Sequence, residues 1–350
     1  MALTAVSAYY STGSQLNRFL DGNVITPSGR DALVAGTYWP DTTTAGVLSG
    51  VSRSSYSGGD ESNLPTGTYE NLNFTSAVTL KNGRTYTFRN CMFSPDGTSA
   101  DSAIIAYSTG TWTADFYDCT IAPTWPAHDD DGTTGGHVQA MEGIKGHHFR
   151  LYRCHITGTV DGVFIFNTES SGAVGTVVVQ QCLIEKAAFW RPDEQARPEG
   201  THNDGIAINS GSGISIVGNN IEWFNDPTIG DAPFSEFTGG DGGLHGLEAG
   251  NNPEQWANGD AIFVRRSLGV IDSLVIDQNR VTGGIVNLRI SGSSGTITNL
   301  TITDNRFGND GIDEGSAGVN VSMDTASKTD ALDYTGNLQE DLTAFSEFLT

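Results

Sequence analysis

Short apolar segments with one spacing recur along most of the chain. In each, two apolar residues stand two positions apart, Cys or Asn follows three positions after the second, and another apolar residue comes two positions later. Apolar residues that alternate in this way are typical of β-strands. The pattern therefore predicts a strand, a turn and a second strand in every repeat. The segments that fit are centred on Cys91, Cys119, Cys154, Cys182, Asn219, Asn279 and Asn305.

A further strand is predicted ahead of each repeat, where a small residue precedes alternating apolar positions. Two stretches align without a gap, His137 to Cys154 and His202 to Asn219, and this alignment matches Met141 with Ile206. Repeats of unequal length built from short strands are typical of a solenoid whose coils bury a shared interior by stacking. The predicted further strands begin at Gly162, Gly205, Ala261, Gly284 and Gly318.

Stacking explains why Cys and Asn share one position of the repeat. Coils that pair through sheets lie roughly 4.8 Å apart, so equivalent residues form a column. Asn amides in such a column can hydrogen-bond to one another and to turn backbone, and Cys is a small residue that buries readily. A structural role is therefore expected for this column. Parallel side-chain directions favour free thiols in this column. The short distance between neighbouring coils would also allow disulfides, so both states are compatible with the spacing.

These repeats resemble the right-handed parallel β-helix of the pectin-lyase-like superfamily. The resemblance rests above all on ThrHisAsnAspGlyIleAlaIle at 201–208 and IleValGlyAsnAsnIle at 216–221, and it covers about 67–337. It implies an all-β, single-stranded right-handed parallel β-helix. Function does not follow, because the fold carries lyases, hydrolases, epimerases, adhesins and phage tailspikes. The catalytic signatures of polygalacturonase-like hydrolases are not matched as a set.

The repeat divides the chain into one long domain with two ends. Residues 1–60 do not fit the pattern and are expected to form an N-terminal cap or attachment region, while 61–340 form the β-helix. A loop excursion is expected at about 223–258, because 60 residues separate Asn219 from Asn279. Residues 341–350 place apolar side chains at helical spacing and predict a short C-terminal cap.

Composition narrows the function classes. The formal net charge is −23, and such a surface repels phosphate backbones and anionic lipid, so nucleic acid is not an expected partner. No apolar run approaches 18 residues, so membrane insertion is not expected. The start of the chain has neither the basic residues nor the apolar stretch of a secretory signal. The cysteine spacing matches no zinc pattern, and no cofactor or metal is indicated.

The candidate chemistry is a column of carboxylates. Asp161, Asp204 and Asp260 each directly precede the small residue of a predicted strand, with Gln139 at the same place one coil earlier and His202 two residues before Asp204. Stacked carboxylates repel, which raises the pKa of at least one, and paired carboxylates serve acid/base and glycosidase chemistry. The alternatives are ordinary Asp-Gly turns, in which Asp bonds its own backbone and Gly takes left-handed angles, and a cation site.

Aromatic and cationic residues suggest a sugar-binding role beside the acids. Trp190 and Trp223 come a few residues after the Cys or Asn position of a repeat, and Trp256 stands in the loop excursion. Arg265 follows Asp260 and could hold an acidic sugar. Flat aromatic faces beside polar groups are common in sugar-binding grooves. The alternative for the tryptophans is packing of loops against the coils.

A β-helix that works outside the cell without a signal peptide is typical of phage virions. We therefore expect a tail-associated virion protein, tailspike-like or a minor tail protein, that binds host surface polysaccharide with or without depolymerase activity. By resemblance, its partners would be other virion tail proteins and two further copies of itself in a homotrimer. The alternatives are a secreted polysaccharide hydrolase or lyase, whose activity would use the stacked carboxylates, and a purely structural spacer or adhesin.

Overall fold

The computed structural model describes the greater part of the repeat region. The described residues are 39–97, 102–106, 113–125, 141–166, 176–189, 203–230, 259–265, 270–291, 297–308, 312–313, 316–317, 321–323 and 331–339.

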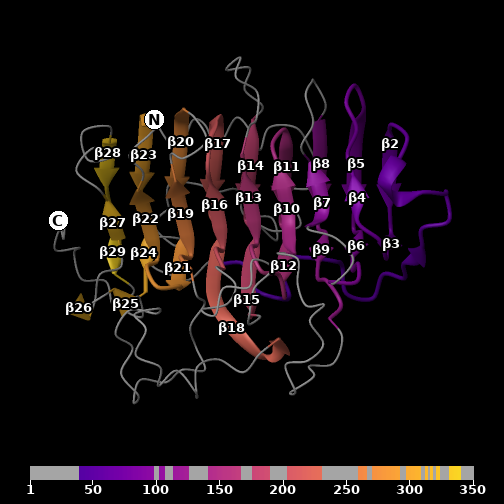
Figure 1. Ribbon diagram of the computed structural model, residues 1–350, viewed down its shortest axis with the longest axis horizontal. Helices are drawn as coiled ribbons and strands as arrows, with labels where there is room; N and C mark the ends of the chain where they lie inside the picture. Colours follow the sequence, from indigo (N-terminus) through magenta and orange to yellow (C-terminus); the bar gives the residue numbers. More distant parts are fainter. Residues whose placement is uncertain are drawn as a thin grey trace, which may run out of the picture.

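Three long sheets make up the fold, and every strand pair within them is parallel (Figure 1). Sheet I contains, in spatial order, β2 (Gly67–Glu70), β5 (Thr85–Arg89), β8 (Thr113–Tyr117), β11 (Phe149–Tyr152), β14 (Val177–Gln180), β17 (Gly211–Val217), β20 (Ile271–Asp277), β23 (Ile297–Thr303) and β28 (Ala331–Thr335). Sheet II contains β1 (Ser54–Ser55), β3 (Leu72–Phe74), β6 (Met92–Phe93), β9 (Thr120–Ile121), β12 (His155–Thr157), β15 (Leu183–Phe189), β18 (Asn220–Gly230), β21 (Arg280–Gly283), β24 (Arg306–Phe307) and β29 (Leu338–Gln339). Sheet III contains β4 (Val78–Thr79), β7 (Ser102–Ala106), β10 (Glu142–Gly146), β13 (Val163–Ile165), β16 (Ile206–Ile208), β19 (Ile262–Arg265), β22 (Leu288–Ser291) and β27 (Val321–Met323).

Each coil takes one strand from sheet I, then sheet II, then sheet III, before the chain returns to sheet I one step further along the axis. The predicted parallel β-helix is therefore confirmed. Outside the three sheets, the described residues also form the 3₁₀ helix η1 (Glu61–Asn63) and an antiparallel ribbon of β25 (Ile312–Asp313) and β26 (Ser316–Ala317).

The inward column of Cys and Asn holds as the repeat predicts. All four cysteines are buried and free, so no disulfide joins neighbouring coils. From Asn219 on, the amides form a continuous ladder: the Nδ2 of Asn219 donates to Oδ1 of Asn279 at 2.8 Å, and the Nδ2 of Asn279 donates to Oδ1 of Asn305 at 2.9 Å. These residues are fully buried, so the ladder satisfies polar groups that have no water to bond.

A tight turn with left-handed backbone precedes each position of this column. Gly218 and Gly336 have positive φ, but most coils place a residue with a side chain there, such as Arg153 at φ 51° and Gln181 at φ 52°. The left-handed region is strained for residues other than Gly, Asn and Asp, so the stacked coils hold these residues against their preference.

Two details of the predicted strand pairing were wrong. Ile206 pairs through Val163 with Ile144, not with Met141, and β22 begins at Leu288 rather than at Gly284. The connections from sheet III to sheet I differ in length from coil to coil. The gapless alignment crosses the connection from β10 to β11 in one coil and from β16 to β17 in the other, and it slips there.

The ends and loops are described only in part. Tyr56 stacks on Phe74 with ring centroids 5.2 Å apart, and Leu64 is fully buried, so these two side chains cover the interior of the first coil. β18 continues into the expected excursion as far as Gly230; residues 231–258 and the expected cap at 341–350 lie outside the described residues.

Candidate functional site

Acidic residues line the edge of sheet III at which the chain arrives from sheet II. Glu142 begins β10, and Asp161, Asp204 and Asp260 stand two residues before β13, β16 and β19. Backbone hydrogen bonds place them in one row: Gly143 N donates to Asp161 O, and the same bond recurs from each coil to the next. We call these four residues the acid row. The predicted column of Asp161, Asp204 and Asp260 is thus confirmed, with Glu142 as its fourth member.

Each aspartate of the acid row is bound to the backbone of the following coil. Oδ1 of Asp161 accepts from Asp204 N at 2.7 Å, Oδ1 of Asp204 accepts from Asp260 N at 2.9 Å, and Oδ1 of Asp260 accepts from Val286 N at 3.2 Å. The carboxylates therefore connect coils rather than closing turns within one coil. This differs from the expected Asp-Gly turn, in which the carboxylate would bond its own backbone.

The glycine that follows Asp161 and Asp204 is explained by close approach, not by backbone angles, and Asp260 is followed by the small residue Ala261. A Cβ on Gly162 would collide with the carbonyl oxygen of Gly205, and a Cβ on Gly205 would lie 2.5 Å from the carbonyl oxygen of Ala261. Neither glycine has positive φ. The small residue therefore lets neighbouring coils pair at the point where the carboxylates bridge them.

The two outer members of the acid row are paired with cations. Oε1 of Glu142 accepts from Lys145 Nζ at 2.7 Å, and Oδ2 of Asp260 accepts from Arg289 Nε at 2.8 Å. Burial nevertheless raises the pKa of the Glu142 carboxyl, and the Lys145 ammonium offsets part of that rise. These charge-assisted bonds fix the ends of the row.

The two central members have no ion pair with any residue that the structure describes, and their titration is perturbed most. Burial raises the pKa of Asp161 well above its usual range, and the charges of Asp204 and Glu142 raise it further. Burial also raises the pKa of Asp204 to about 7, with a contribution from the Asp260 charge. Since adjacent carboxylates share protons, the pair holds at least part of a proton at neutral pH.

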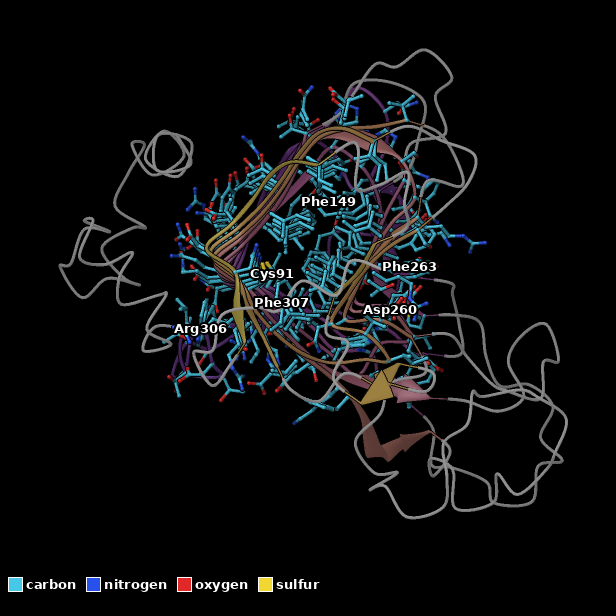
Figure 2. The ribbon with its side chains drawn as sticks, turned by 90° about the vertical axis from the view of Figure 1, so that its left-hand side faces the viewer. Cys91, Phe149, Asp260, Phe263, Arg306 and Phe307 are labelled. Carbon is cyan, nitrogen blue, oxygen red and sulfur yellow. The ribbon has the colours of Figure 1, made fainter. Side chains whose placement is uncertain are left out.

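A second row runs parallel to the acid row on the outer surface of sheet III. The strand register places Lys145 beside Phe164, Phe164 beside Ala207, Ala207 beside Phe263, and Phe263 beside Arg289. We call these five residues the outer row. Two aromatic side chains thus flank a small one, with a cation beyond each, and Figure 2 shows Asp260 and Phe263 on the same side of the coil.

The aromatic members of the outer row are partly accessible. Phe164 and Phe263 are half-buried, whereas Ala207 between them is almost fully buried. The Lys145 ammonium lies 5.4 Å from the centroid of the Phe164 ring, which is cation–π distance. The row therefore offers apolar ring surface between charged groups.

The other predicted site residues have different outcomes. Arg265 is exposed at the end of β19, and its charge lowers the pKa of Asp204, so it lies within electrostatic range of the acid row. Trp223 is fully buried, and its indole Nε1 donates to Asn203 O at 2.8 Å. The expected sugar contact of Trp223 is thus wrong, because the ring packs inside the coil. The remaining predicted residues lie outside the described residues: His202, Trp190, Trp256 and Gln139.

Several residues of this face have no counterpart in the sequence-based prediction, namely Glu142, Lys145, Phe164, Phe263 and Arg289. The gapless alignment put Gln139 in the acid row, and that error hid Glu142. Phe164 and Phe263 could have been found, because they occupy outward positions of strands whose other outward residues are polar or small.

This arrangement can bind and polarise an uncharged polar ligand. Carboxyls on neighbouring coils are separated by about the strand spacing of ~4.8 Å, close to the separation found in retaining glycosidases. One protonated and one ionised carboxyl provide a hydrogen-bond donor and an acceptor side by side.

In the described part of the chain, no group of three or more His, Cys, Asp or Glu side chains is arranged to hold a metal ion. No helix among the described residues is long and apolar enough to span a membrane. Comparisons with protein-family models, with curated proteins and with solved structures found no match.

Proposed function

We propose that this protein is a tail-associated phage virion protein, tailspike-like or a minor tail protein, that binds host surface glycan along the outer face of sheet III. The observation that carries the proposal is the outer row beside the acid row: two half-buried phenylalanines, cations at both ends and carboxyls in between. The fold itself does not select this function, because parallel β-helices also occur in lyases, hydrolases, epimerases and adhesins.

The chemistry of the face favours sugar over other ligands. Sugar rings present C–H surface that packs on aromatic rings and hydroxyls that bond carboxylates and cations. The formal net charge of −23 disfavours polyphosphate ligands. A glycan lying along the helix axis would meet Phe164, Ala207 and Phe263 in order.

Binding can be tested with purified host envelope polysaccharide and isothermal titration calorimetry. Truncating either Phe164 or Phe263 to Ala removes one stacking surface, and we expect about tenfold weaker binding for each. Tyr152→Ala is the matched control, because Tyr152 is a half-buried aromatic on the outer surface of sheet I. Equal binding by wild type and both phenylalanine variants would exclude this face as the site.

A second candidate function, glycan hydrolysis, is favoured by the unpaired central carboxyls Asp161 and Asp204. A carboxyl with a pKa of about 7 is suited to general acid catalysis at neutral pH. We expect release of reducing ends from host polysaccharide, lost in Asp204→Asn but kept in Asp272→Asn, whose carboxylate bonds Thr298 and Asn299 on sheet I. Absorbance of unsaturated sugars in place of reducing-end gain would indicate the secreted-lyase alternative.

The virion assignment adds two expectations about partners. Other tail proteins would anchor the chain, and light scattering of the full chain would give the mass of a homotrimer. Gene neighbours that encode carbohydrate uptake would instead favour a secreted enzyme, and absence of glycan binding across a broad panel would favour a structural spacer or adhesin.

A further inference from the structure

An N-terminal segment runs across the outside of sheet II against the order of the coils. We call residues 40–53 the strap. Its first described anchor is at β18, where Nδ2 of Asn220 donates to Pro40 O at 3.0 Å. Further on, Gly46 N donates to the carbonyl oxygen of Arg153, in the turn before β12, at 2.8 Å. The strap thus lies on residues that are far away in sequence.

The strap then passes two more coils and joins the first. Val47 N donates to Oγ1 of Thr120 at 3.0 Å, and Leu48 N donates to Oδ1 of Asn90 at 2.6 Å. After the strap, β1 pairs in parallel with β3. Between Pro40 and β1 the strap therefore spans the coils of β18, β15, β12, β9, β6 and β3, the first six of the solenoid, as the indigo trace in Figure 1 shows.

The strap is closely fitted at its centre and free of close contacts near its end. Gly46, at φ 85°, has no room for a Cβ, which would lie 2.6 Å from Oγ1 of Thr120 and 2.8 Å from Cβ of His155. Pro40, Ala45 and Gly46 are buried. By contrast, Gly50, at φ 75°, has nothing within 4 Å of its Cβ position. Position 46 therefore requires glycine both for its left-handed backbone and for lack of space, whereas position 50 requires it only for its left-handed backbone.

The path of the strap bears on how the solenoid opens. In a stack where each coil contacts only its neighbours, coils detach from the end one after another. The strap is anchored to the sixth, fourth, third and second coils and continues into β1 on the first, so it crosses every boundary between these six coils. Separating any two of these coils then also requires the strap to detach on one side.

We propose that the strap ties the first six coils into a single opening unit and so keeps the acid row in register. Glu142, Asp161, Asp204 and Asp260 belong to the third to sixth coils, which the strap crosses on the opposite side from sheet III. Coils that slipped or frayed singly would break the hydrogen bonds between successive aspartates. This role of the strap does not depend on which ligand the acid row binds.

Hydrogen exchange of the full-length chain, read by mass spectrometry under native conditions, tests the proposal. In Gly46→Ala we expect exchange about tenfold or more faster for residues 46–48 and for the strands of the strapped coils between 85 and 180. Strands beyond the strap, between 271 and 303, should exchange at the wild-type rate. Gly50→Ala is the matched control: it strains a positive φ equally but meets no neighbour, so the strapped coils should keep wild-type exchange.

Three results would overturn the proposal. Faster exchange at 46–48 with unchanged strands at 85–180 would show that the strap is bound but ties nothing together. Unchanged exchange at 46–48 in Gly46→Ala would show that the strap is not seated as described. Equal acceleration in Gly46→Ala and Gly50→Ala would assign the effect to backbone strain. If Gly46→Ala does not fold, Thr120→Val removes one anchor hydroxyl at nearly constant shape, and a severalfold acceleration confined to the strapped coils is then expected.

Discussion

Replacing Asp204 with Asn should stabilise the protein at neutral and alkaline pH. Asn has nearly the shape of Asp and keeps the Oδ1 that accepts from Asp260 N at 2.9 Å. It removes a half-buried charge that has no cation partner among the described residues and that also raises the pKa of Asp161. The substitution thus keeps the bridge between coils and removes the electrostatic cost of ionising it.

The size of the gain follows from the pKa of Asp204, which is raised from 3.8 to about 7. A shift of about three units corresponds to a ceiling of roughly 4 kcal/mol, and because the side chain is partly exposed we expect about 1 to 3 kcal/mol. Below pH 4 both folded and unfolded chains hold the proton, so no cost exists. Between pH 4 and pH 7 only the unfolded chain has lost it, so wild-type stability falls as pH rises, and above pH 7 the cost is constant.

Urea unfolding followed by circular dichroism at pH 4, 6 and 8 measures this effect. Compared with the wild type, Asp204→Asn should raise the urea concentration at the unfolding midpoint most at pH 8, less at pH 6 and hardly at pH 4. Asp272→Asn is the control, because hydrogen bonds from Thr298 and Asn299 lower the pKa of Asp272 and so favour its charged form in the folded chain. Removing the Asp272 charge should therefore not stabilise the protein at pH 8. A gain for Asp204→Asn that is the same at all three pH values, or a loss at pH 8, would show that ionisation of Asp204 does not destabilise the folded chain.

Three further predictions concern the stacked coils and use unfolding midpoints as the measurement. Lys186→Gly should stabilise by about 0.5 to 1 kcal/mol, because glycine relieves the left-handed backbone at φ 59° and the exposed Lys186 side chain gives up no buried packing; no change would mean that this strain is absent. Asn279→Ala should destabilise by about 3 kcal/mol or more by leaving buried ladder groups unpaired, and Asn279→Cys by less, since Cys fills the same column in earlier coils; equal losses would contradict this. Gly162→Ala should lower the free energy of unfolding by about 2 kcal/mol or more, because the added Cβ collides with the next coil. Gly83→Ala should lower it by about 1 kcal/mol, because Gly83 has left-handed backbone but open space around it; a larger loss for Gly83→Ala would contradict the close approach at Gly162.

The fold was predictable because its signal is repeated. Each coil places an apolar pair, Cys or Asn, and another apolar residue at the same spacing, so the sharp turn between sheets I and II has a constant length. The connection from sheet III to sheet I has no constant length, and there the alignment slipped: Met141 was matched with Ile206, whose true register partner, through Val163, is Ile144. Local spacing thus fixes register only across turns of constant length.

The site was predictable only in part for the same reason. The aspartates of the acid row were found because Asp stands directly before a small residue in three coils, but Glu142 was missed at the slipped position. Trp223 was misplaced because the alternation was not followed beyond Ile221: two residues after an inward position lies another inward one, and Trp223 is fully buried. The strap could not be foreseen, since its contacts join residues up to 180 positions apart without any shared pattern.

The most direct test of the glycan-binding face is a hydrogen-exchange footprint of the wild-type protein with and without host surface polysaccharide. We expect slower exchange on sheet III, at 161–165, 204–208 and 260–265, with no change on sheet I at 113–117 and 149–152. Protection confined to sheet I, or no protection at saturating polysaccharide, would contradict it.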